Sequence, residues 1–179
     1  MFLIIREVMT VKEYLECGFV TNVHGLKGAL IVKHVCDSYD AFASLKRIYI
    51  EEGKDKFSPL KVIKCSPYKG LALVYLEGIT DADKAMTMRK KTLFAHRDDI
   101  PRDEGDFFIV DLIGLEVFDA SSNVKYGMLK DVINSGAQDI YVIEGENGKM
   151  SYVPAIKEFV AEISLEKGIM ITPIEGMIE

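Results

Sequence analysis

The chain has 179 residues, of which 49% are hydrophobic and 28% are charged, and its formal net charge is −6. This composition excludes a largely disordered chain, and the longest apolar run near the start, residues 1–5, is far shorter than the roughly 20 residues that cross a bilayer. The three cysteines stand at wide spacings with no Cys-x-x-Cys pair, so we expect reduced thiols in a cytoplasmic protein and no disulfide framework.

The first 13 residues do not have the pattern of a signal peptide. Arg6 and Glu7 interrupt the apolar run, and no small-residue cleavage site follows. We expect residues 1–13 to be a disordered leader or an over-extended start, with Met9 as an alternative first residue.

Charge is distributed unevenly along the rest of the chain. Residues 14–97 carry 14 lysines and arginines against 9 aspartates and glutamates, whereas residues 98–179 carry 6 against 17. A basic half favours a phosphate-rich surface, and an acidic half repels nucleic acid and attracts basic protein. The two halves are therefore expected to face different partners.

The basic half shows short strand-like runs separated by turns. These runs are rich in Val, Ile, Leu and Tyr and are bounded by Gly, Pro, Asp or Ser. They cover residues 14–21, 28–35, 47–51, 60–66, 71–76 and 92–96. Six short strands predict a small closed barrel, with a helical turn within residues 37–45.

The clearest helix in this half covers residues 81–91. Thr80 can cap its N-terminus, acidic side chains fill the first turn, and Arg89, Lys90 and Lys91 stand in the last turn. We expect this helix to lie across one end of the barrel with its basic end in solvent.

A five-residue turn, His24-Gly25-Leu26-Lys27-Gly28, joins the first two strands. Its two glycines suit a tight connection that presents side chains outward. A phosphate-cradling loop would lead into a helix, whereas a strand follows here. We therefore predict a contact loop whose tips are His24 and Lys27, with Leu26 anchoring it in the barrel or in a partner.

The second half begins after a polar stretch. Residues 98–106 carry five acidic side chains and contain Pro101 and Gly105, which predicts a linker. Further strands are expected at residues 115–118, 127–133, 140–143, 150–154, 159–163 and 169–172, with one helical turn over residues 156–161. The second half, residues 107–179, is thus predicted to be another small β-barrel, and the fold mainly β.

The sequence gives no catalytic or metal-binding pattern. The three histidines have no Ser or Cys nucleophile motif beside them, and the isolated histidines and cysteines supply no ligand pair. The acidic side chains fall at strand ends and turns, where capping and solvation are ordinary roles. Aromatic residues do not interleave with the basic ones, so autonomous recognition of an RNA sequence is not expected.

Five stretches together resemble the RimM family of ribosome maturation factors. They are GFVTNVHGLKG at 18–28, LEGITDADKA at 76–85 leading to Met88 and Arg89, DLIGLEV at 111–117, SGAQD at 135–139 followed by Tyr141 and Val142, and YVPAI at 152–156. Their order and spacing run through both predicted domains. The resemblance implies a six-stranded N-terminal barrel like those of translation factors and a C-terminal PRC-barrel.

The resemblance also implies a non-enzymatic assembly factor that promotes maturation of the small-subunit head and processing of its ribosomal RNA. The implied partners are the nineteenth small-subunit ribosomal protein and the immature subunit with its RNA, and no cofactor, metal or membrane is implied. A monomer is expected. The alternatives are a flavin- or nucleotide-binding enzyme built on the first barrel and a PRC-barrel adaptor for another cytoplasmic partner.

Two sets of candidate site residues follow from the resemblance. The RNA- or ribosome-facing set is His24, Gly25, Leu26, Lys27, Gly28, Arg89 and Lys90. The protein-binding set is Phe107, Phe108, Asp111, Leu112, Gly136, Asp139 and Pro154. Phenylalanines at 107 and 108 replace the tyrosines frequent in the family, so a partner contact there depends on packing instead of hydroxyl hydrogen bonds. The family's common Pro-Phe is Pro154-Ala155 in this chain.

Overall fold

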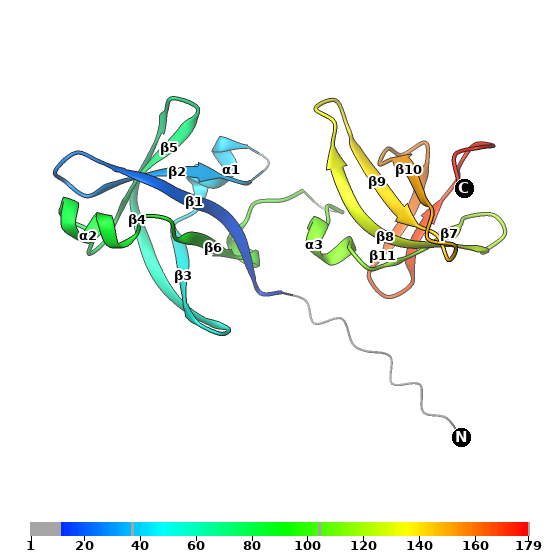
Figure 1. The fold of residues 1–179 in the computed structure, drawn as a ribbon, viewed down its shortest axis with the longest axis horizontal. Helices are drawn as coiled ribbons and strands as arrows, with labels where there is room; N and C mark the ends of the chain where they lie inside the picture. Colours follow the sequence, from blue (N-terminus) through cyan, green and yellow to red (C-terminus); the bar gives the residue numbers. More distant parts are fainter. Residues whose placement is uncertain (1–11, 37, 104, 179) are drawn as a thin grey trace, which may run out of the picture. The chain divides into compact units, whose positions relative to one another are not determined.

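The computed structural model describes residues 12–36, 38–103 and 105–178, so most of the leader expected over residues 1–13 lies outside the described residues. The chain divides into two compact units, Met1–Glu104 and Gly105–Glu179 (Figure 1). None of the described helices is long and apolar enough to cross a membrane. The bounds of the linker expected over residues 98–106 stay a prediction.

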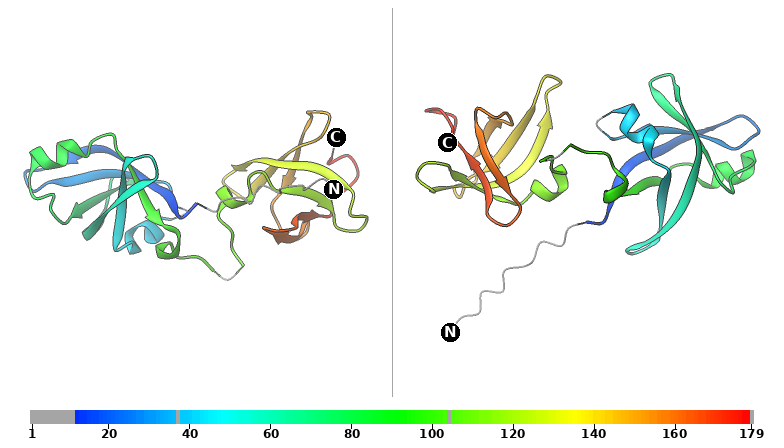
Figure 2. Two further views of the ribbon diagram at one scale, coloured as in Figure 1. Left: turned by 90° about the horizontal axis from the view of Figure 1, so that it is seen from below. Right: turned by 180° about the vertical axis from the view of Figure 1, so that it is seen from behind.

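The first unit is a closed barrel of six strands in the order β1-β2-β5-β4-β3-β6 (Figures 1 and 2). All its neighbouring strands are antiparallel. The predicted six-stranded barrel is therefore confirmed. Its elements are β1 (Tyr14–His24), β2 (Ala29–His34), α1 (Tyr39–Ser44), β3 (Arg47–Gly53), β4 (Lys56–Tyr68), β5 (Leu71–Leu76), α2 (Ala82–Thr87), β6 (Thr92–His96) and the 3-10 turn η1 (Arg97–Asp99).

Alternate side chains fill the interior of this barrel. On β5, Ala72, Val74 and Leu76 are buried, and the residues between them are only half-buried. Successive side chains of a strand point to opposite faces, so the other residues of β5 lie on the outer surface. The outer faces of β4 and β5 can therefore carry a site without disturbing the core.

Helix α2 is capped by a different residue from the one predicted. Asp81 is the N-cap in place of Thr80, and its Oδ1 accepts a hydrogen bond from the Lys84 amide at 2.8 Å. This hydrogen bond is the main reason that the pKa of Asp81 lies below its usual value. Aspartate is among the best N-cap residues because its short carboxylate reaches an unpaired amide of the first turn.

Helix α2 also ends earlier than predicted. The chain leaves the helix after Thr87 and turns at Lys90, whose φ is 65°. The Lys90 amide then donates a hydrogen bond to the Val20 carbonyl on β1 at 2.9 Å. Because this pairing with β1 takes the place of another helical turn, residues 89–91 follow the helix and do not form its last turn.

The second unit is a six-stranded sheet in the order β10-β9-β8-β7-β12-β11. Strands β7 and β12 pair in parallel, and the other neighbours are antiparallel. Its elements are α3 (Ile109–Leu112), β7 (Glu116–Asp119), β8 (Lys125–Asn134), β9 (Asp139–Glu144), β10 (Met150–Pro154), β11 (Val160–Ser164) and β12 (Gly168–Ile171). The mainly β fold with a few short helices is confirmed, although α3 is not among the predicted helices.

One carboxylate organises the loop between β7 and β8. Asp119 Oδ1 accepts hydrogen bonds from the amides and hydroxyls of Ser121 and Ser122, and Oδ2 accepts one from the Tyr126 hydroxyl at 2.6 Å. The Ser121 hydroxyl, followed by the Tyr126 hydroxyl, holds the pKa of Asp119 well below its usual value. The same contact is the main reason that the pKa of Tyr126 is raised to about 12.

Replacing Asp119 by Asn should lower the melting temperature of the second unit at neutral pH, because the amide accepts fewer of these hydrogen bonds. A carboxyl whose folded pKa is depressed contributes stability above its ordinary pKa of 3.8 and loses that contribution as the pH falls through the folded value. The difference in melting temperature between wild type and variant should therefore become smaller as the pH falls from about 7 to about 3. Thermal unfolding followed by circular dichroism measures it. The exposed Glu158→Gln is the control, and a difference that does not change with pH would contradict the prediction.

Candidate functional site

The turn between β1 and β2 consists of Gly25, Leu26, Lys27 and Gly28, and it lies beside α2 in every view (Figures 1 and 2). His24 and Ala29 pair at the ends of the two strands. The two glycines have φ values of 65° and 73°, in the left-handed region that glycine adopts without strain.

Gly28 is buried against the chain that leads into α2. A β-carbon at this position would lie 2.8 Å from the carbonyl oxygens of Ile79 and Asp81 and 2.9 Å from the Asp81 amide nitrogen. At Gly25, by contrast, a β-carbon would meet nothing within 4 Å. Gly28 therefore fixes the turn to the barrel, whereas at Gly25 only the positive φ angle requires a glycine.

Leu26 and Lys27 project from the turn. Leu26 is 87% exposed, so the expectation that it anchors the turn in the barrel is wrong, and Gly28 makes that contact instead. Lys27 is exposed and has no ion-pair partner within the described part of the chain.

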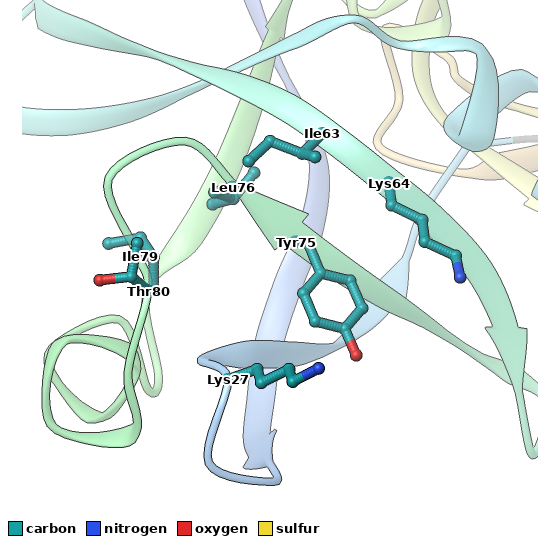
Figure 3. Close-up of a pocket in the computed structure, with 7 residues that line it drawn as sticks. All are labelled: Lys27, Ile63, Lys64, Tyr75, Leu76, Ile79 and Thr80. Carbon is teal, nitrogen blue, oxygen red and sulfur yellow. The ribbon is translucent and has the colours of Figure 1, made fainter.

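An open hollow of about 490 Å³, here called the turn pocket, lies next to this turn (Figure 3). Figure 3 shows the end of the Lys27 side chain directed toward the hydroxyl end of Tyr75, with Lys64 extending beside them. Aliphatic side chains complete the pocket, which therefore combines apolar surface with two cations. The residues that line it are Lys27, Ile63, Lys64, Tyr75, Leu76, Ile79 and Thr80.

A bulge in β4 builds one wall of the turn pocket. Val62 pairs with Leu76 and Lys64 pairs with Tyr75, so Ile63 is an extra residue on β4. In a bulge, two residues of one strand oppose a single residue of the other. Ile63 is consequently displaced to the surface, where it is 64% exposed.

His24 contacts the hairpin that joins β4 to β5. Its ring centroid lies 5.2 Å from that of Tyr68, and the Lys69 Nζ lies 5.6 Å from the same Tyr68 ring. Lys69 and Gly70 both have positive φ, as in a two-residue type I′ hairpin turn. Sequence reasoning missed the contact with Tyr68 because no local pattern links that residue to His24.

Arg89 and Lys90 do not lie in the turn pocket. Both are exposed, and the Lys90 backbone pairs with Val20 on β1. Val20 is four residues before His24, which corresponds to roughly 14 Å along a strand. The residues of the predicted RNA-facing set therefore lie in two places, the turn at residues 24–28 and a separate basic group beside Val20 on β1.

Three residues of the predicted protein-binding set meet in the second unit. Phe107, Leu112 and Asp139 line a hollow of about 190 Å³, here called the α3 hollow. Leu112 belongs to the core and is 4% exposed, whereas Ile109 on the same short helix is 44% exposed. The other lining residues are Gly105, Asp106, Ile109, Val132, Tyr141, Ala155 and Ile163.

The remaining four residues of that set do not line the α3 hollow. Phe108 is the N-cap residue of α3, Asp111 is buried on that helix, and Pro154 pairs with Ile140 at the end of β10. Gly136 is exposed in the turn between β8 and β9, with a φ of 84°.

Gly136 is nevertheless linked to the hollow through Asn134. The Gly136 amide donates to Asn134 Oδ1 at 2.9 Å, and the Asn134 side-chain amide donates to Asp139 Oδ1 at 2.8 Å. A glycine in this turn therefore helps to hold a carboxylate in place at the rim of the α3 hollow.

The described residues contain no group of three His, Cys, Asp or Glu side chains that could hold a metal ion. None of the three cysteines forms a disulfide; Cys17 is buried, and Cys36 and Cys65 are half-buried. Burial raises the pKa of the Cys17 and Cys65 thiols, which makes them poor nucleophiles at neutral pH.

Two domain models of a single family match the chain. The RimM N-terminal domain covers residues 15–100, and the RimM PRC barrel domain covers residues 109–176. The chain belongs to the RimM family. The family that the five sequence stretches resemble is therefore confirmed.

Curated members of the RimM family match over nearly their full length. The ribosome maturation factor RimM of Clostridioides difficile (strain 630) is 38% identical over 170 residues, which are 93% of this chain and 96% of that protein. The RimM of Alkaliphilus oremlandii (strain OhILAs) is 39% identical over 169 residues, which are 92% of this chain and 98% of that protein. The solution structure of the RimM N-terminal domain from Thermus thermophilus is 21% identical and has a TM-score of 0.43, covering 51% of this chain and 98% of that one.

The two glycines of the turn should respond differently to substitution. Gly25→Ala should lower the free energy of unfolding of the first unit by about 1–2 kcal/mol, the cost of a left-handed alanine. Gly28→Ala should cost about 3 kcal/mol or more, because its β-carbon also forces the backbone at residues 79–81 to move. Urea unfolding of the full chain measures both values, and equal losses would contradict the role assigned to Gly28.

Proposed function

We propose that this chain is a maturation factor of the small ribosomal subunit, which assists the folding and processing of its ribosomal RNA without catalysing a reaction. The observation that carries the proposal is the match of both RimM domain models, in order, over most of the chain. The names of the curated relatives, ribosome maturation factors, support it. We propose that the chain acts in the cytoplasm, where subunits assemble, and that it acts as a monomer.

The opposite charges of the two halves support the proposal that each half binds a different partner. Residues 14–97 carry an excess of lysine and arginine, and residues 98–179 carry an excess of aspartate and glutamate. We propose that the first barrel approaches ribosomal RNA and that the PRC-barrel holds the nineteenth small-subunit ribosomal protein, which is basic. The acidic domain would shield the charge of this protein until it docks on the RNA.

The exposed cations of the first barrel are the proposed RNA contacts. Lys27, Arg89 and Lys90 are exposed and have no ion-pair partner within the described residues. Their charges are therefore available to phosphates, which attract lysine and arginine with little regard to sequence.

The α3 hollow is the proposed contact for the ribosomal protein. It presents the exposed side chain of Ile109 next to Phe107, with the carboxylate of Asp139 also lining it. An apolar centre with carboxylates beside it suits an apolar side chain flanked by lysine or arginine.

Reversing two of the proposed RNA contacts should weaken binding to the immature small subunit. Lys27→Glu combined with Arg89→Glu is expected to reduce co-sedimentation in a gradient about tenfold at low salt, and by less at high salt because ions screen exposed charges. Lys54→Glu combined with Lys56→Glu changes the net charge equally at the β3–β4 hairpin and should have a much smaller effect. Unchanged co-sedimentation of the first variant would remove the RNA-facing role of these residues.

The α3 hollow can be tested with the purified nineteenth ribosomal protein. Ile109→Ser in the full chain should weaken binding at least about fivefold, which is about 1 kcal/mol, by removing apolar area at the proposed contact. Ile174→Ser is the matched control, because Ile174 is 63% exposed and lies outside the hollow. Calorimetric titration gives both affinities, and equal losses, or no binding by wild type at low salt, would count against the acidic domain as the holder of this protein.

A further inference from the structure

The turn pocket has the electrostatic character of an anion site. Two of its lining residues, Lys27 and Lys64, are cations, and none is acidic. Neither lysine has an ion-pair partner in the described part of the chain, although Lys61, earlier on β4, pairs with Glu77 at 3.6 Å. The two positive charges are therefore uncompensated, and both residues line the same pocket, on either side of the Tyr75 ring in Figure 3.

The pocket also offers an aromatic face beside one of the cations. Lys64 and Tyr75 are directly paired across β4 and β5, and cross-strand neighbours have β-carbons about 5 Å apart. Figure 3 shows the Tyr75 ring standing in the pocket, supported from β5. An aromatic ring next to a lysine fits a nucleobase and the phosphate attached to the same nucleotide.

The aliphatic wall distinguishes a nucleotide from a simple anion. A phosphate ion would use only the positive charge of the lysines and leave Ile63 exposed to water. The pocket, at about 490 Å³, is larger than one phosphate requires and falls within the usual range of ligand sites. A base that stacks on Tyr75 and covers Ile63 uses the apolar surface and the charges together.

Stacking on Tyr75 requires a base whose face is accessible, and this requirement decides which form of RNA can bind. In a duplex the faces of the bases are stacked on one another, so only an unpaired base can lie on an aromatic ring. We propose that the turn pocket binds one unpaired nucleotide of single-stranded RNA, with its base on Tyr75 and its flanking phosphates held by Lys27 and Lys64. This inference rests on the proposed function, because it takes RNA as the partner of the first barrel.

Binding of the full chain to a 12-nucleotide single-stranded RNA of mixed sequence, labelled with fluorescein, tests the site. Fluorescence anisotropy at several salt concentrations gives the slope of log K against log salt. Lys64→Gln should reduce this slope by about 0.7, the contribution of one phosphate contact in a single strand. Tyr75→Leu should weaken binding about tenfold without changing the slope, because stacking does not release ions. Tyr75→Phe keeps the ring and should bind like wild type.

Matched controls separate the pocket from general charge and from unfolding. Lys56→Gln removes an exposed lysine eight residues earlier on β4, and Tyr152→Leu removes a tyrosine in the second unit that is 57% exposed. Both should bind like wild type. Thermal unfolding of each variant shows whether the barrel is intact. If Tyr75→Leu unfolds, Tyr75→Ile takes its place, because a β-branched side chain suits a strand and also lacks the ring.

Three results would overturn the site. They are wild-type affinity in a folded Tyr75→Leu chain, equal changes for Lys56→Gln and Lys64→Gln, and equal competition by the matching RNA duplex or by a glutamate-rich peptide. The co-sedimentation assay keeps this failure apart from failure of the proposed function. A chain that co-sediments with immature subunits but does not bind the single strand loses only the pocket site, whereas a chain that does neither loses both.

Discussion

The close approach of Gly28 to the backbone at Ile79 and Asp81 is the contact on which the surface of the first barrel depends. No side chain stands between them, so the β1–β2 turn rests directly on the chain that leads into α2. Lys27 is the neighbour of Gly28 and is therefore held beside the turn pocket. The same segment supplies Ile79 and Thr80 to the pocket and Asp81 to the cap of α2. One missing β-carbon thus positions the turn, the pocket and the helix together.

The fold was predictable where side-chain pattern and turns agree. Strands β5, β6 and β10 have the predicted bounds because each is a short run rich in apolar and aromatic residues that turns flank. Helix α3 could not be found in this way, since four residues, Ile-Val-Asp-Leu, are too few to show a helical period and look like a strand. The end of α2 was misplaced for another reason: the pairing of Lys90 with Val20 is a tertiary contact that overrides local helix preference.

The candidate site shows the same limit. The turn at residues 24–28 can be predicted because two glycines mark it, but the pocket beside it cannot. Lys64 and Tyr75 stand eleven positions apart and become neighbours only through the register of β4 and β5. Basic and aromatic residues that do not interleave along the sequence therefore meet across strands in this pocket. Of the two anchors expected for Leu26, the barrel is excluded because the close packing that holds the turn belongs to the glycine two positions later, and a contact with a partner stays a prediction.

The bulge in β4 allows the outer surface of the barrel to change without a change in strand pairing. Ile63 is additional to the pairing of β4 with β5, so the strand would keep its alternation of inward and outward side chains if that residue were deleted. Val62 would still oppose Leu76, and Lys64 would still oppose Tyr75. The barrel and its outer wall can therefore change independently in evolution: a single insertion or deletion can reshape the outer surface beside the turn while the packed interior stays as it is.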